Sequence, residues 1–349
     1  MKVIDLFSGV GGLSLGFKSA GFDVELALEK DREIADSYKL NHMEVEMINK
    51  DITDVNMNNT FSKYSNKDVI IIGGPPCQGF SQKGNRELLN DKRNFLFKFF
   101  YEVVRLVRPK YFLIENVPNI LTARDGYFKD EITNLFSNLG YKIDKQILNA
   151  INFGVPQKRK RAFILGKLGK NKISLPKGND SQIVTIRNAI SDLAFLNSGE
   201  GEEVQDYKFN SSSAYQKEMR KNSKKLYNHV ATNHSKKVIK RLEMIPVGKG
   251  REVLPKEHLT KSIYSGTWSR MKEDEPSVTI TTRYDTPSSG RFTHPFLNRA
   301  ITTREAARIQ SFPDTFIFYG TKSSKMKQVG NAVPPLLAKS IANVIKMDI

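Results

Sequence analysis

The stretch from Val69 to Ser81, V-I-I-I-G-G-P-P-C-Q-G-F-S, decides how the rest of the chain is interpreted. Its first four residues are β-branched, which is typical of a short strand buried on both faces of a parallel α/β sheet. The Gly-Gly-Pro-Pro run then ends the strand, because it can continue neither a strand nor a helix. We therefore expect Cys77 on a stiff loop just past the carboxyl end of the strand, where open α/β sheets place their chemistry.

Cys77 is the only cysteine among the 349 residues. Most free cysteines are small buried apolar groups, but a packing cysteine does not need two glycines and two prolines before it. We interpret Cys77 as a nucleophile. A single cysteine excludes a disulfide framework, and a free reactive thiol suits a reducing cytoplasm.

The amino-terminal residues predict a strand, a glycine turn and a helix. Val3 to Phe7 is apolar and extended, residues 8–12 form the turn, and Leu13 to Ala20 has helical spacing. Glycines at 9, 11 and 12 let the backbone approach a ligand at the start of a helix, as in nucleotide sites. Ser14 stands where the dinucleotide fingerprint requires a third glycine, which argues against a dehydrogenase.

Two acidic residues strengthen the nucleotide interpretation. Val24 to Leu28 is predicted as the second strand, and Glu29 at its end lies 18 residues after Gly11, about where a ribose-binding acid is expected. Ile48 to Ile52 suggests a third strand end that carries Asp51. These features indicate a nucleoside cofactor without deciding which one.

Glu115 repeats the geometry of the cysteine loop. Residues 94–107 predict an amphipathic helix, and Tyr111 to Ile114 predicts a buried strand that ends in Glu-Asn-Val-Pro. If the strands that precede Cys77 and Glu115 are neighbours, both side chains converge on one crevice. The alternative is a structural role in which Glu115 caps the following turn.

A basic segment follows a helix predicted at 128–139 and a strand predicted at 143–149. Alternation along an extended chain places Gln157, Arg159 and Arg161 on one face and the intervening lysines on the other. Residues 162–166 predict one more strand.

The regular alternation of strands and helices ends near Lys177. We expect a catalytic and cofactor-binding domain at 1–184, a smaller irregular domain at 185–295, and a segment at 296–349 that returns to the first domain. The clearest strand of the second domain is predicted at 276–282. The returning segment is predicted to hold a helix at 303–310 capped by Thr302 or Thr303, a loop at 328–335 and a last helix to Ile345.

Charge indicates a polyanionic partner. The net charge is +18, and between Gln157 and Lys177 eight Lys or Arg residues stand with no Asp or Glu. Between Gln216 and Arg251 eleven basic residues stand against two acidic ones. Nucleic acid is the leading candidate partner. We expect no membrane span, because no run of 18 apolar residues exists, and no signal peptide, since the amino terminus leads straight into a strand.

The histidines predict no metal site. None of His42, His229, His234, His258 and His294 has the spacing of a metal-binding motif. We expect His229 and His234 near DNA or solvent.

Together these residues resemble the DNA (cytosine-5)-methyltransferase family, specifically the single-chain bacterial enzymes of restriction–modification type. The resemblance lies in six blocks, in the family's order, that span nearly the whole chain outside about 180 to 275. The blocks are Asp5 to Gly12, Pro75-Pro76-Cys77-Gln78, Glu115-Asn116-Val117, Gln157-x-Arg159-x-Arg161, Arg304 to Pro313, and Gly330 to Pro335.

The resemblance implies a Rossmann-like S-adenosylmethionine-dependent methyltransferase sheet with a smaller target-recognition domain. It implies S-adenosyl-L-methionine as the cofactor. The cofactor-binding residues it implies are Phe7, Ser8, Gly9, Gly11, Gly12, Glu29, Lys30, Asp51, Ile52, Pro76, Leu96, Asn331 and Ala332.

The resemblance also implies the chemistry. Carbon-5 of cytosine is too electron-poor to attack a methyl group, so the Cys77 thiolate would first add at carbon-6. Glu115, neutral through burial, would hold or deliver a proton at N3, and Arg161 would contact O2 with Arg159 supporting it or sharing the task. Asn116 would brace the cysteine loop. Water is the expected base that removes the carbon-5 proton.

The substrate implied is double-stranded DNA with the target cytosine rotated out of the stack. Residues 185–295 would read the sequence, Gln78, Ser81 and Gln157 would contact DNA, and the segment 79–92 is the candidate for closing over the base. We expect a cytoplasmic, nucleoid-associated monomer with a possible cognate restriction endonuclease. Two alternatives stay open: a tRNA cytosine methyltransferase, and a non-catalytic DNA-binding relative, which should have lost Cys77, Glu115 or the glycine turn.

Overall fold

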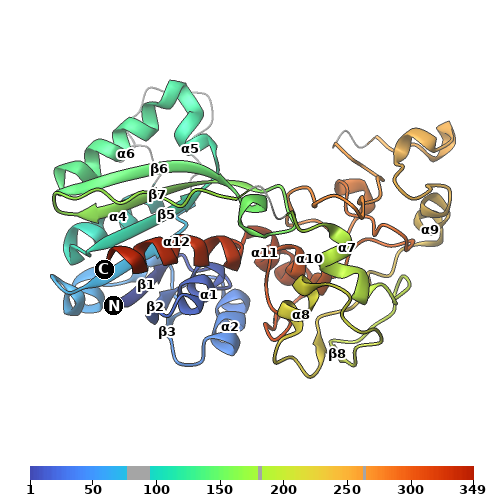
Figure 1. Ribbon diagram of the computed structural model, residues 1–349, viewed down its shortest axis with the longest axis horizontal. Coiled ribbons are helices and arrows are strands. Elements are labelled where there is room, and N and C mark those ends of the chain that lie inside the picture. The colour runs from blue at the N-terminus through green and yellow to red at the C-terminus, as the bar shows by residue number, and fades with distance from the viewer. Residues whose placement is uncertain (77–94, 180–182, 262–264) are drawn as a thin grey trace. The chain divides into compact units, whose positions relative to one another are not determined.

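A computed structural model describes residues 1–76, 95–179, 183–261 and 265–349 (Figure 1). Contacts divide the chain into two compact units, and each is considered by itself. The first unit holds Met1–Phe153, Lys160–Asn179 and Pro335–Ile349, and the second holds Gly154–Arg159 and Asp180–Pro334. The division near residue 180 lies close to the predicted boundary at 184. Residues 296–334 group with the second unit, so by contacts the return to the first unit begins at Pro335.

The first unit is built on a sheet of seven strands in the order β3-β2-β1-β4-β5-β7-β6. The first five strands in that order are parallel, whereas β7 and β6 run antiparallel to their neighbours. This is the expected Rossmann-like α/β architecture. The strands are β1 (Lys2–Leu6), β2 (Asp23–Leu28), β3 (Glu46–Ile48), β4 (Val69–Gly73), β5 (Tyr111–Asn116), β6 (Tyr141–Asn149) and β7 (Lys160–Leu168).

The direction of the strand order reverses between β1 and β4. Leu6 and Gly73 are paired at their carboxyl ends, so the glycine turn after β1 and the loop that leads to Cys77 start side by side. The backbone carbonyl of Leu6 occupies the space that a side chain at Gly73 would need. Ligands of open α/β sheets bind in the crevice at such a reversal, outside the carboxyl ends of the strands.

Helices cover this sheet. The carboxyl-terminal helix α12 packs against α1, where Gly16 leaves room for Ala338. The helices are α1 (Gly12–Ser19), α2 (Arg32–Asn41), α3 (Met57–Phe61), α4 (Phe95–Val107), α5 (Asn119–Thr122), α6 (Tyr127–Asn138) and α12 (Pro335–Asp348).

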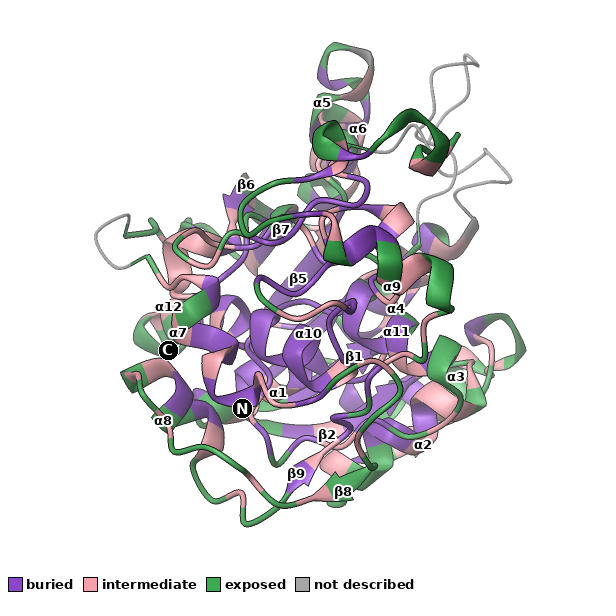
Figure 2. Cartoon of the chain, turned by 90° about the vertical axis from the view of Figure 1, so that its right-hand side faces the viewer, coloured by how far each residue is buried: buried purple, intermediate pink, exposed green. Residues whose placement is uncertain are grey.

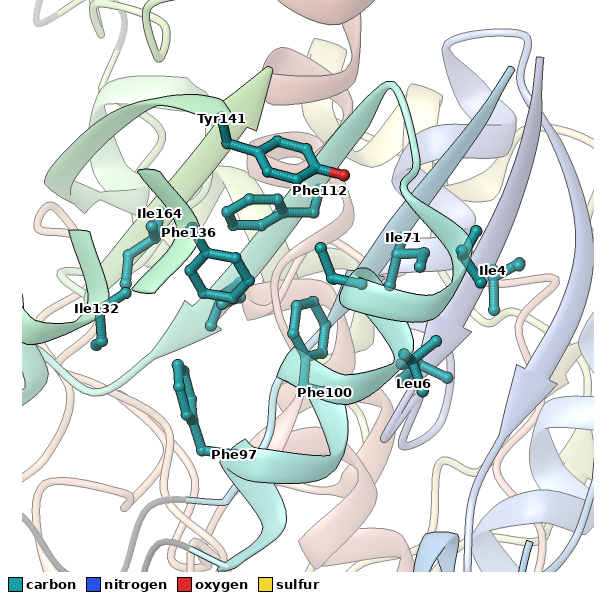
Figure 3. Close-up of a cluster of buried hydrophobic side chains, with 14 of the residues drawn as sticks. Ile4, Leu6, Ile71, Phe97, Phe100, Phe112, Ile132, Phe136, Tyr141 and Ile164 are labelled. Atoms are coloured by element: carbon teal, nitrogen blue, oxygen red, sulfur yellow. The ribbon is translucent and has the colours of Figure 1, made fainter. Parts of the chain in front are cut away.

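A buried cluster joins the sheet to α4 and α6 (Figure 3). Phe112 of β5 lies at its centre, with ring centroids 4.2 Å from Phe136 of α6, 5.0 Å from Tyr141 of β6 and 6.4 Å from Phe100 of α4. Gly166 of β7 has no side chain where the Phe112 ring lies. Each fully buried side chain of this kind contributes about 1.5–3 kcal/mol through removal of apolar surface from water. The cluster therefore fixes the strands whose ends carry the site.

The second unit has little sheet. Its elements are α7 (Ile186–Ile190), β8 (Val204–Gln205), α8 (Ala214–Arg220), β9 (Leu226–Tyr227), α9 (Lys236–Glu243), α10 (Thr303–Ile309) and α11 (Lys322–Asn331). The predicted strand at 276–282 is wrong, because this segment makes only one isolated bridge, between Ser277 and Gln157. The predicted loop at 328–335 is also wrong at its start: Gln328 to Asn331 form the end of α11.

Helix α10 is the buried centre of the second unit (Figure 2). Thr302 caps it, as one of the two predicted cap residues, and shares a capping box with Glu305. The Glu305 carboxylate accepts hydrogen bonds of 2.8 Å from both terminal nitrogens of Arg299, and both side chains are fully buried. Arg308 binds Asp192 and Asp314 at 2.6 and 2.7 Å. Removing one partner of such a buried ion pair destabilises the protein, because the other charge is left buried and unpaired.

Among the residues described, no helix combines the length and the apolar character needed to cross a lipid bilayer.

Candidate active site

The turn between β1 and α1 has the backbone that a close ligand approach requires. Phe7, Gly9 and Gly11 all adopt positive φ angles, of 57°, 54° and 92°. A non-glycine residue such as Phe7 rarely occupies this region, and its strain is of order 1–3 kcal/mol. A Cβ atom on Gly11 would lie 2.5 Å from His42 Nε2, whereas one on Gly9 would meet nothing within 4 Å. Gly11 thus packs inward and Gly9 borders open space.

Glu29 lies directly after β2 and is tied to this turn. Its Oε2 accepts a hydrogen bond of 3.0 Å from the Gly9 backbone N–H, and its Oε1 accepts one of 2.9 Å from the Asp31 backbone N–H. Burial raises the pKa of Glu29, and these backbone donors partly offset the shift. A carboxylate has about four lone-pair positions, and the backbone of Lys30 also donates to it, so about one position remains for a ribose hydroxyl. The open side of Gly9 beside a fixed carboxylate fits a nucleoside.

The segment after β3 carries Asp51, but not at a strand end as predicted. The strand ends at Ile48, and Asp51 caps a short 3₁₀ helix by accepting a hydrogen bond of 3.1 Å from the Thr53 backbone N–H. Asp51 Oδ2 lies 3.8 Å from Lys30 Nζ. Asn49 donates to the carbonyl oxygens of Glu29 and Lys30, which fixes the two segments together. Ile52 is buried behind Asp51.

A buried polar cluster below the turn was missed by our sequence analysis. Ser14 Oγ donates to Asp5 Oδ2 at 2.6 Å and lies 2.7 Å from the Tyr38 hydroxyl. Asp5 is fully buried, its Oδ1 has no hydrogen-bond partner in the described part of the chain, and burial raises its pKa to about 7. The signal was a carboxylate inside an otherwise apolar strand, which is a costly position for a charge.

Glu115 and Arg161 meet at the carboxyl end of β5. Arg161 is at the start of β7, and its Nε lies 3.1 Å from Glu115 Oε1, with side chains only 18% and 12% exposed. A Cβ atom on Gly74 would lie 3.2 Å from the other carboxylate oxygen, so the loop that leads to Cys77 runs directly past this pair. The condition for the predicted convergence is met, because β4 and β5 are adjacent and parallel. Cys77 itself lies outside the described residues, so its approach to Glu115 stays a prediction.

Asn116 connects the two strand ends. Its side-chain amide donates a hydrogen bond of 2.9 Å to the carbonyl oxygen of Pro75, two residues before Cys77. Its Oδ1 accepts from the Val117 backbone N–H at 2.9 Å. This contact has the geometry of the bracing role that the resemblance implies. Pro76 is exposed, and Leu96 is half-buried in the first turn of α4.

Gln157 and Arg159 lie in the second unit and are enclosed by protein. The predicted alternation is observed, because both side chains are buried whereas Lys158 and Lys160 are exposed. However, both are fully buried and their polar groups bind protein atoms. Neither side chain presents surface to DNA in this structure. The DNA contact expected of Gln157, and the expectation that Arg159 supports Arg161 or shares its task, stay predictions.

A family model described as C-5 cytosine-specific DNA methylase matches residues 1–347. The chain belongs to this family. It is a DNA cytosine-5-methyltransferase.

Relatives of this methyltransferase include Type II methyltransferases over its full length. M.DdeI of Desulfomicrobium norvegicum is 41% identical across 99% of this chain and 88% of that protein. M1.HphI of Haemophilus parahaemolyticus is 38% identical across 100% of this chain and 87% of that protein. A crystal structure of a prophage-encoded DNA modification methyltransferase from E. coli has a TM-score of 0.79 at 29% identity and covers 99% of each chain. The S. pombe Dnmt2 methyltransferase, with a TM-score of 0.63 at 20% identity across 99% of this chain and 98% of that one, shares the fold.

Three predicted site residues of the methyltransferase, Cys77, Gln78 and Ser81, lie outside the described residues, as does the segment predicted to close over the base. Asn331 is exposed at the end of α11, and Ala332 after it is buried.

The histidine prediction for the methyltransferase is wrong for His229. Its ring is fully buried, with Nδ1 2.9 Å from the Thr302 hydroxyl and Nε2 3.0 Å from the Leu193 carbonyl oxygen. His234 is half-buried, and its Nε2 accepts from the Ala300 backbone N–H at 3.1 Å. Over the described ranges no group of three or more His, Cys, Asp or Glu residues could hold a metal ion.

Proposed function

We propose that this methyltransferase transfers a methyl group from S-adenosylmethionine to carbon-5 of a cytosine flipped out of a specific duplex DNA sequence, through a covalent bond between Cys77 and carbon-6. The observation that carries the proposal is the Glu115–Arg161 pair, which lies at the ends of β5 and β7 beside Gly74, in the loop that follows β4. An acid and a guanidinium lie there against the loop that leads to the nucleophile.

The proposed chemistry begins with the Cys77 thiolate. Its sulfur forms a bond to carbon-6, and the electron pair of the 5,6 double bond moves toward N3 and O2. Glu115 holds a proton at N3 while Arg161 stabilises the negative charge at O2, both in a site of low exposure where such interactions are strong. S-adenosylmethionine, when bound, supplies the methyl group that carbon-5 accepts. Water then removes the carbon-5 proton, and the thiolate leaves as the double bond reforms.

The proposed cofactor site follows the turn after β1. Phe7, Ser8, Gly9, Gly11 and Gly12 would border the methionine part. Glu29 would accept from a ribose hydroxyl through its remaining lone-pair position, and Lys30, Asp51 and Ile52 would border the adenine. Pro76, Leu96, Asn331 and Ala332 are further proposed contacts. The open side of Gly9 and the fixed Glu29 carboxylate support this arrangement.

The proposed biological role is protection of host DNA in a restriction–modification system. The Type II relatives support it. A cognate endonuclease acting on the same site would be the partner, and the enzyme would act as a cytoplasmic, nucleoid-associated monomer. Residues 185–295 would recognise the sequence, with contacts to phosphates offsetting a cost of base flipping of about a few kcal/mol.

The test uses duplex DNA in which the target cytosine is 5-fluorocytosine. Because fluorine at carbon-5 cannot leave as a proton does, we expect a covalent enzyme–DNA adduct that needs both S-adenosylmethionine and Cys77. Bisulfite sequencing of DNA from cells that express the chain supplies the target sequence. Adduct formation by Cys77→Ser, or modification of tRNA in place of DNA, would refute the proposal.

A further inference from the structure

Three buried side chains of the second unit form one connected group, which we call the buried bracket: Gln157, Arg159 and Gln310. All three are fully buried, although glutamine and arginine are normally exposed. A buried polar group costs stability unless it is hydrogen-bonded, so the partners of the bracket indicate its role.

Gln157 joins two segments that are distant in sequence. Its Oε1 accepts a hydrogen bond of 2.7 Å from the Ile280 backbone N–H, and its Nε2 donates one of 2.7 Å to Gln310 Oε1. The backbone beside it pairs with the same segment, because the Lys158 N–H donates to the Ser277 carbonyl oxygen at 2.8 Å. The segment predicted as a strand is therefore held by side chains instead of by a sheet.

Arg159 and Gln310 extend the bracket to the end of α11. Arg159 donates to the carbonyl oxygens of Ile280 at 3.1 Å and Gly330 at 2.9 Å. Gln310 donates to the carbonyl oxygens of Val329 at 2.7 Å and Ala332 at 3.4 Å. The carbonyls of Val329, Gly330 and Ala332 lie at the end of α11, where the helix itself leaves them without partners.

The backbone at Gly330 also packs closely against its neighbours. A Cβ atom on Gly330 would lie 2.5 Å from the Thr281 carbonyl oxygen. The bracket and this contact fix the backbone on both sides of Asn331, while Asn331 itself is exposed. Rigid support of an exposed polar residue is what a binding site requires.

We infer that the buried bracket positions Asn331 and Ala332 for the cofactor, and that Gln157, Arg159 and Gln310 are positioning residues that contact neither DNA nor the target base. The inference rests on the proposed function, in which Asn331 and Ala332 bind S-adenosylmethionine. It also explains why a glutamine, an arginine and a glycine are needed at these buried positions.

The first experiment titrates S-adenosylmethionine into the full-length protein by calorimetry. Arg159→Lys retains one cation but cannot reach both carbonyls with a planar fork, and Gln310→Ala removes the link to Val329. We expect each change to raise the cofactor Kd about tenfold, and the KM for cofactor to rise more than kcat falls. Thermal unfolding of each variant shows that it folds. If Arg159→Lys does not fold, Gln310→Ala carries the same expectation.

The matched control is Gln328→Ala. Gln328 of α11 is buried like the two bracket glutamines, but it donates to the Tyr319 carbonyl oxygen and the Ser324 hydroxyl, away from the bracket. Gln328→Ala should lower the free energy of unfolding and leave the cofactor Kd unchanged. Equal cofactor losses in the control and the bracket variants would overturn the inference.

A double-mutant cycle with Asn331→Ala separates positioning from general destabilisation. If the bracket acts through Asn331, Arg159→Lys should raise the cofactor Kd less than threefold in the Asn331→Ala background, compared with about tenfold alone. Full additivity would refute the positioning role. A wild-type protein that binds no S-adenosylmethionine would instead refute the proposed function itself.

Discussion

Among single residues, Glu115 carries the clearest functional prediction. Glu115→Gln keeps the shape of the side chain but removes the charge that pairs with Arg161 at 3.1 Å. We expect the rate of methyl transfer to fall about 10²–10⁴-fold, as for other positioned proton-transfer groups. The cofactor Kd should stay within about twofold of the wild-type value, since the carboxylate of Glu29 is untouched. Single-turnover rates with labelled cofactor measure the first effect, and a rate within tenfold of wild type would contradict the role.

Asp5 allows a prediction about stability. Burial raises the pKa of Asp5 to about 7 in the folded protein, well above the ordinary value of an aspartate. The folded state therefore holds a proton that the unfolded state releases between pH 4 and 7, and stability falls as pH rises through this window. Asp5→Asn removes this loss of stability. The free energy of unfolding of the variant minus that of the wild type should therefore be larger at pH 8 than at pH 4, by about a few kcal/mol. Urea unfolding at both pH values measures it, and parallel pH profiles would count against the buried charge.

At the scale of elements, the pairing of α1 with α12 fixes the carboxyl terminus to the helix that follows the glycine turn. A side chain at Gly16 would overlap Ala338 and the backbone of Lys339. Gly16→Val should destabilise the protein by about 1–3 kcal/mol through overpacking. Ser19→Val on the exposed side of the same helix is the control and should cost less than about 1 kcal/mol. Chemical denaturation compares them, and equal costs would show that the helix contact is not tight.

The elements also show what sequence could and could not predict. The helix at α4 and the strands at β1, β2, β4 and β5 were predictable because their apolar periodicity is local. The segment at 276–282 was not, because its alternating pattern resembles a strand while its hydrogen bonds go to Gln157 and Arg159, more than a hundred residues away. Gly330 is predicted in a loop, yet it lies inside α11, where a Cβ atom would meet the backbone of Thr281.

For the whole molecule, the site was easier to predict than the organisation around it. Glu29, Glu115 and Arg161 stand at strand ends, and a parallel sheet brings strand ends together whatever the loops do. The buried roles of Gln157, Arg159 and His229 depend on packing between segments that no local pattern records. Residues 296–334 are another case. Their sequence predicts a return to the first domain, whereas their contacts group them with the second unit.

The response of the whole chain to acid follows from its buried histidines. Burial lowers the pKa values of His42 and His229 to about 4 and that of His294 to about 3. These rings stay neutral in the folded protein, whereas the unfolded chain binds protons below its ordinary histidine pKa near 6.5. The contribution of these histidines to stability should therefore be fully present above pH 6.5 and be lost as pH falls toward 4. The three protons that they take up on unfolding are opposed by the one proton that Asp5 releases. We expect unfolding at pH 5 to take up about two protons, measured by potentiometry during denaturation. Unfolding without proton uptake at this pH would mean that the rings are charged in the folded protein.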